Sequence, residues 1–144
     1  MTTVNIELPE IPGVKEWRWA ATEGCAPLSR KVFKKWLFKV GASHLEEDAT
    51  LLFSELFSNA LRYPPPDRLI PTRWLVLPDG IRVEVDDASS QDPVVSSPEE
   101  EAESGRGLIL VHLLAARWGV KHRRFNDGKG NYLSGKTVWF ELRK

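Results

Sequence analysis

The hydrophobic pattern changes its period along the chain, and this change restricts the fold more than any other feature. Between residues 28 and 62, the apolar residues mostly recur every three or four positions, as they do along one face of a helix. Later segments alternate between apolar and polar residues, as strands with one buried face do. Helices that interrupt antiparallel strands predict an α+β fold in which helices pack on a sheet.

Two helices are predicted in the first half of the chain. The apolar stripe of the first ends at Gly41 and comprises Leu28, Val32, Trp36 and Val40, with Phe33 and Leu37 beside it. The second is predicted to begin at Ser43, with Glu46 completing a capping box, and to end at Arg62, before three consecutive prolines. Its buried stripe comprises Leu45, Ala49, Leu52, Leu56 and Ala60.

The remaining elements are marked by alternation and by turn residues. A hairpin is predicted around an Asp-Gly turn at residues 79–80, and a third helix over residues 107–116. The predicted strands are 4–8, 17–20, 72–77, 81–85, 118–122 and 137–142, with a loop over 125–135. Together they predict a single domain over residues 1–144. Its expected form is a two-layer α/β sandwich, with a mixed, mostly antiparallel sheet and helices on one face.

Charge is balanced in total but segregated along the chain. The formal net charge is zero, which disfavours a general nucleic-acid binder, because such proteins are normally basic. Residues 84–105 nevertheless carry eight acidic and no basic residues, whereas residues 106–144 carry nine basic and two acidic ones. The polar face of the first predicted helix is also basic, with Arg30, Lys31, Lys34, Lys35 and Lys39. We interpret that face as solvated surface, with a partner-docking face as the alternative.

Neither a disulfide nor a membrane segment is indicated. Cys25 is the single cysteine, and the N-terminal residues lack the apolar run of a signal peptide. The longest apolar stretches are too short to cross a bilayer. We therefore expect a cytoplasmic protein that contacts neither membrane nor nucleic acid directly.

Two polar residues one helical turn apart form the first chemical motif. Glu55 and Asn59 lie on one face of the second predicted helix. A carboxamide oxygen suits Mg²⁺, a hard ion that keeps several waters and needs few protein ligands. A carboxylate beside it could take a proton from an attacking hydroxyl group or water. Alone, such a pair more often belongs to an ordinary polar helix face.

Three further motifs follow in the second half. Asp87, followed by Ser89, stands at a strand end and could accept a hydrogen bond from an exocyclic amine. A long acidic loop over 88–104 precedes Gly105-Arg106-Gly107, which opens a helix whose free N–H groups favour phosphate. Gly135-Lys136-Thr137 enters the last strand, a segment that carries little information by itself.

In this order and spacing, the motifs resemble those of the GHKL ATPases, which have the Bergerat or histidine kinase-like ATPase fold. The segment ELFSNALRY at residues 55–63 resembles the N box of that family, and VEVDDASSQDP at 83–93 occupies the place of its first glycine box. The segment ESGRGLILVHLLAARWGV at 103–120 resembles the second glycine box, and GKTVWFEL at 135–142 the terminal strand. The resemblance spans residues 18–142 and is strongest to small anti-sigma factor serine kinases.

The resemblance implies a role for each matching residue. Asn59 would coordinate Mg²⁺ between the phosphates of ATP, and Glu55 would act as the general base. Asp87 would bind the adenine amine, with Thr137 near the base through water. The remaining ATP-binding positions would be Ser89, Gly105, Arg106, Gly107 and Leu108, and residues 88–104 would form a lid. Expected partners are a sigma factor, an anti-anti-sigma regulator of the STAS type, or both, with a homodimer also expected.

The sequence departs from the family in two places. Both glycines of the first glycine box are missing after Asp87, so the tight turn would need another backbone path, and Tyr63 stands where many relatives have histidine. Three functions remain open at this point. They are a kinase that phosphorylates a serine of a partner, a nucleotide-dependent binding switch without turnover, and a scaffold that binds no nucleotide.

Overall fold

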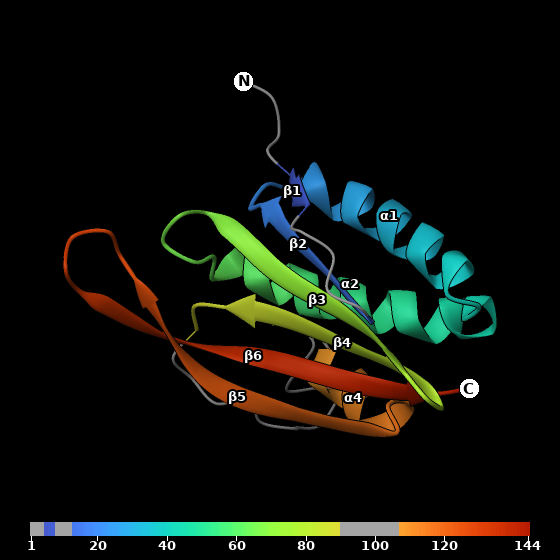
Figure 1. Cartoon of the computed structure of the whole chain (residues 1–144). Helices are drawn as coiled ribbons and strands as arrows, with labels where there is room; N and C mark the ends of the chain where they lie inside the picture. Colours follow the sequence, from blue (N-terminus) through green and yellow to red (C-terminus); the bar gives the residue numbers. More distant parts are fainter. Residues whose placement is uncertain (1–4, 8–12, 90–106) are drawn as a thin grey trace.

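The computed structural model describes residues 5–7, 13–89 and 107–144, with side chains described for 13–89 and 110–144. Its helices are α1 (Cys25–Lys39), a short 3-10 helix (Ser43–Leu45), α2 (Glu46–Arg62) and α4 (Gly107–Leu114). Its strands are β1 (Asn5–Glu7), β2 (Val14–Ala20), β3 (Leu69–Leu77), β4 (Gly80–Asp87), β5 (Arg117–Asn126) and β6 (Tyr132–Arg143). The helices lie against one face of the sheet (Figure 1), which confirms the predicted two-layer α+β sandwich.

The sheet has the strand order β1-β2-β3-β4-β6-β5, and all of its described pairings are antiparallel. The predicted, mostly antiparallel sheet is thus found, and its pairs among the described residues include no parallel one. Two helices rather than one join β2 to β3, so the chain returns in the opposite direction. β4 and β5 run parallel to each other, but they do not pair, because β6 lies between them and is antiparallel to both.

Both long helices are confirmed, with changes at their ends and faces. In α1 the buried stripe is centred on Phe33 and Leu37, whereas Leu28 is exposed. The capping box was wrong, because Ser43 begins the 3-10 helix and α2 has no side-chain cap. The stripe predicted for α2 is buried from Ala49 to Ala60.

The last hairpin is longer than the sequence predicts. Residues 125–135 were expected to form a loop, but β5 continues to Asn126 and β6 begins at Tyr132. The turn residues are confined to the few positions between them. There Asn126 Oδ1 accepts a bond from the backbone N–H of Gly128, and Asp127 Oδ1 accepts one from that of Lys129. Side chain-capped turns of this kind close a hairpin without interrupting its ladder.

An aromatic cluster forms the core between the sheet and the two long helices. Phe33 of α1 and Phe53 of α2 have ring centroids 4.7 Å apart, and both rings pack against Trp74 of β3 at 5.0 and 5.8 Å. Contacts of this type stabilise a core beyond the apolar area they bury. The cluster fixes α2 against the sheet, and α2 carries Glu55 and Asn59. Within the described ranges, no helix is long and apolar enough to span a bilayer.

Candidate functional site

The C-terminal end of α2 and the end of β4 are joined by a backbone hydrogen bond. The Ala88 N–H donates to the carbonyl of Tyr63 at 2.7 Å. This bond connects the segment that contains Glu55 and Asn59 to the strand end that carries Asp87. Elements from separate parts of the sequence, predicted to share a site, therefore meet at one end of the sandwich.

Asp87 is buried at this end, on the face of the sheet that the helices cover. Its side chain lies on the same face of β4 as those of Val83 and Val85, which belong to the core. Asp87 Oδ1 accepts hydrogen bonds from Lys136 Nζ at 2.8 Å and from the Ser89 N–H at 2.9 Å. Burial raises the pKa of the Asp87 carboxyl, while the bonds from Lys136 and Ser89 act in the opposite direction.

Lys136 is the site residue that sequence reasoning missed. The register pairs Asp87 with Lys136 and Asp86 with Thr137, so Lys136 faces Asp87 on the helix-covered side. Thr137 lies on the opposite face, where its hydroxyl donates to Asp86 Oδ1 at 2.5 Å. Thr137 therefore points away from the face on which Asp87 lies, and its role near a bound base stays a prediction. The two-residue period of the last strand places Lys136 on the face of Val138 and Phe140, and that of β4 places Asp87 on the face of Val83 and Val85. Alternation is therefore the signal that could have put both residues on the core side, although it does not give the register that pairs them.

Gly135 allows β6 to approach the end of β4. A Cβ atom at this position would lie 2.5 Å from the Asp87 carbonyl oxygen and would overlap the ring of Phe125. Glycine is thus required by a close approach of two backbones.

A surface hollow of about 540 Å³ beside Gly135 is lined by His122, Arg123, Arg124, Ser134 and Gly135 itself. It is lined by none of the residues that the sequence assigned to the site.

Glu55 and Asn59 lie half-buried on α2, one turn apart as predicted. The Glu55 carboxylate makes no hydrogen bond with another described residue. Asn59 Oδ1 accepts a hydrogen bond of 2.6 Å from Nη2 of Arg62, an exposed residue in the last turn of the helix. The carboxamide oxygen that would bind a metal is therefore paired with the guanidinium group of Arg62.

The first of the two missing glycines, at position 89, is explained by the path of the backbone, whereas the second position, Gln91, lies outside the described residues. Arg68 is the sole non-glycine residue with positive φ in the described part of the chain, so neither Ala88 nor Ser89 adopts a conformation that favours glycine. The N–H groups of Ala88 and Ser89 are both satisfied, by Tyr63 and by the Asp87 side chain. The strand end is thus built without the glycine turn that the sequence lacks.

Comparison with protein-family models matches residues 19–136 to the histidine kinase-like ATPase domain. The chain belongs to this family. A comparison with curated proteins found no match. Domains of this family bind ATP, typically with Mg²⁺, and membership supports an ATP-binding regulatory function.

The described residues of this histidine kinase-like ATPase domain fit a purine nucleotide at the base-binding end. Asp87 has one carboxylate oxygen, Oδ2, that accepts no hydrogen bond from another described residue, so it can accept one from an exocyclic amine. The carboxamide of Asn59 is a ligand type that Mg²⁺ accepts. When bound, Mg-ATP supplies a phosphoryl group together with the cation that neutralises its charge.

The residues assigned to the phosphates are only partly described. Gly105, Arg106 and the lid positions from 90 onward lie outside the described residues. Gly107 is the first residue of α4, and the backbone of Leu108 continues this helix. Val111 of the same helix is buried in the core, and α4 packs next to α2. The phosphate roles of these residues stay predictions.

Proposed function

We propose that this histidine kinase-like ATPase domain is a protein serine kinase of the anti-sigma factor type. It would transfer the γ-phosphate of ATP to a serine of a partner regulator. The observation that carries the proposal is the junction of α2 with β4, where the Ala88 N–H bonds to the Tyr63 carbonyl. Through this junction, the helix that carries the half-buried Glu55 and Asn59 is joined to the strand that ends at the buried, half-satisfied Asp87.

Each residue has a distinct role in the proposed transfer. Asp87 binds the base, and Asn59 holds Mg²⁺ at the phosphates. Glu55 takes the proton of the partner's serine hydroxyl while that oxygen bonds to the γ-phosphorus and the bond to the leaving ADP breaks. Phosphoryl transfer depends mostly on positioning and charge neutralisation, so a carboxylate that bonds to no other described residue suits this role.

The proposed substrate is an anti-anti-sigma regulator of the STAS type, and a sigma factor is the proposed binding partner. A homodimer and a cytoplasmic location belong to the same proposal. The exposed lysines of α1 (Lys31, Lys34, Lys35 and Lys39) offer a basic surface for acidic segments of such a partner.

Glu55→Gln tests the catalytic assignment most directly. The chain would be incubated with radiolabelled Mg-ATP and purified STAS-type regulators, and phosphoserine would be measured. We expect Glu55→Gln to lower transfer by about 10²-fold or more, the range typical of general bases, with ATP affinity nearly unchanged. Glu47→Gln, at an exposed position of the same helix, is the matched control and should behave like wild type. Equal transfer by Glu55→Gln and wild type would contradict the assignment.

A nucleotide-dependent binding switch without turnover is the second candidate. It is favoured by one observation: Arg62 occupies the Asn59 oxygen on which Mg²⁺ would be held. Calorimetry with Mg-ATP separates the two functions. Binding that is lost in Asn59→Ala, together with no transfer to any regulator tested, would support the switch over the kinase. Absence of ATP binding by wild type would contradict both, and the scaffold without nucleotide would then remain.

A further inference from the structure

The ion pair of Asp87 and Lys136 lies at the edge of an otherwise apolar face. Lys136 is 7% exposed and Asp87 3% exposed. On the same face the next pair along the two strands is Val85 with Val138, both in the core. Two charged side chains thus occupy the face of β4 and β6 on which the preceding residues are apolar and belong to the core.

Such a pair is a costly way to fill a core position. Removing two charges from water costs several kcal/mol per ion, and apolar residues of similar volume are often as stable or more stable. Stability alone therefore gives little reason for a lysine here. Buried titratable groups beside a ligand position more often serve recognition or catalysis.

The geometry of the pair leaves one side of the carboxylate open. Both described bonds to Asp87, from Lys136 Nζ and from the Ser89 N–H, end on Oδ1. A carboxylate held at one oxygen cannot rotate freely, so the position of Oδ2 is fixed. The backbone of β6 is fixed as well, because Gly135 lies directly against the Asp87 carbonyl.

We propose that Lys136 is the positioning residue of the base-reading carboxylate: it holds Asp87 by Oδ1, so that Oδ2 is presented to the exocyclic amine of adenine. The inference rests on the proposed binding of ATP at this site. Burial raises the pKa of Asp87, and the ammonium group of Lys136 counteracts this by favouring the ionised acceptor. Without Lys136, the carboxyl group would be more readily protonated and less well oriented.

A thermodynamic cycle tests this role by changing the lysine and the ligand together. The affinities of ATP and of purine riboside 5′-triphosphate, in which hydrogen replaces the 6-amino group, would be measured by calorimetry for wild type and Lys136→Met. We expect wild type to bind ATP about tenfold or more tightly than the analogue, because a hydrogen bond to a charged group discriminates by about this much. In Lys136→Met the preference should fall close to one, with little change in the affinity of the analogue.

Three further variants separate positioning from a general loss of structure. Lys121→Met makes the same chemical change on the exposed surface of β5 and should keep the preference for ATP. Lys136→Arg keeps the charge and should restore most of the preference. If Lys136→Met does not fold, Lys136→Gln, which keeps a donor without charge, should still show a reduced preference.

The outcomes distinguish this inference from the proposed function. A Lys136→Met protein that keeps the wild-type preference for ATP would overturn the positioning role and leave ATP binding intact. Equal loss of affinity for both nucleotides would also overturn it, because that result indicates a structural role. A wild-type protein that binds neither nucleotide would contradict the proposed function itself.

Discussion

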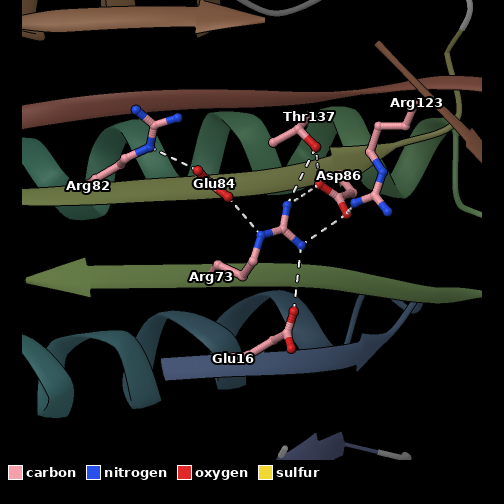
Figure 2. A network of polar contacts seen from close by, with 7 residues as sticks. All are labelled: Glu16, Arg73, Arg82, Glu84, Asp86, Arg123 and Thr137. Atoms are coloured by element: carbon pink, nitrogen blue, oxygen red, sulfur yellow. Dashed lines mark hydrogen bonds and ion pairs between the residues drawn. The ribbon is translucent and has the colours of Figure 1, made fainter. Parts of the chain in front are cut away.

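Two adjacent aspartates of β4 have opposite surroundings because a strand directs successive side chains to opposite faces. Asp87 faces the helices, and its described bonds all end on Oδ1. Asp86 faces the open side of the sheet, where both of its oxygens are occupied. Arg73 donates to Oδ1 at 2.6 Å and to Oδ2 at 3.2 Å, while Thr137 bonds to Oδ1 and Arg123 to Oδ2 (Figure 2).

The comparison shows how the same residue type can be saturated with hydrogen bonds at one position and half-satisfied at the next. Asp86 is 0% exposed and is the centre of a network whose members come from five strands, β2 to β6 (Figure 2). The network continues through Arg73 to Glu84 at 2.7 Å and to Glu16 at 3.7 Å. A saturated acceptor has no capacity for a ligand, whereas the half-satisfied Asp87 does. We therefore expect changes at Asp86 to act on stability and changes at Asp87 to act on ATP affinity.

The largest effect is expected from Asp86→Asn. Replacing one carboxylate oxygen by an NH₂ group places donors against Arg73 and Arg123 and removes the charge that compensates them. We expect a loss of about 3 kcal/mol in the free energy of unfolding, as for other broken buried ion pairs, measured by urea denaturation. ATP affinity of the folded protein should stay within about threefold of wild type.

An exposed ion pair supplies the control for this change. Asp79 bonds to Arg143 at 2.8 Å, and its side chain is 65% exposed. Asp79→Asn should cost at most about 0.5 kcal/mol, since exposed pairs contribute little. If Asp86→Asn were as mild, or if it weakened ATP binding more than Asp87→Asn, the division of roles between the two aspartates would be wrong.

Gly135→Ala is expected to have the next largest effect and to act on both faces. The added methyl group would lie 2.5 Å from the Asp87 carbonyl oxygen, and neither backbone can shift without disturbing the ladder. We expect a loss of about 2 kcal/mol, within the range for overpacked sites, together with weaker ATP binding because Lys136 and Asp87 move apart. Gly24→Ala is the control, since it has ordinary φ and nothing within 4 Å. A stable Gly135→Ala protein would show that β6 can move away from β4.

The sequence predicted the architecture well because its periodic patterns are long. The stripe of α2 and the Asp-Gly hairpin each follow from repeated local rules, and both are found. The helix cap was wrong because a short 3-10 helix precedes α2 and takes the place of the cap at Ser43. The loop before β6 was predicted too long, because only part of the polar segment 125–135 forms the turn and the rest extends β5 and β6.

The site was predicted less completely, for a reason specific to strands. Glu55, Asn59 and Asp87 follow from motifs whose residues lie within single elements. The partner of Asp87 comes from another strand, and a shift of one residue in register would exchange Lys136 for Thr137. Register between strands depends on tertiary packing, here including the contact of Gly135 with the end of β4. No local pattern in the sequence records that contact.

The smallest expected effect concerns pH, and its sign differs between the two faces. Burial tends to raise the pKa of Glu84, but bonds from Arg73 and Arg82 outweigh it and hold this pKa below its usual 4.5. The stability that Glu84 contributes is therefore present above about its usual pKa and is lost as pH falls through its pKa in the folded protein. Burial raises the pKa of Asp87 above its usual 3.8. The stability that Asp87 contributes is therefore present below its usual pKa and is lost as pH rises through its pKa in the folded protein.

Unfolding free energies of wild type, Glu84→Gln and Asp87→Asn would be compared from about pH 3 to 7. As pH rises, the advantage of wild type over Glu84→Gln should grow, and its advantage over Asp87→Asn should shrink, each by roughly 1 kcal/mol or less. If both differences changed in the same direction, the two faces of β4 would not differ in the way their hydrogen bonds indicate.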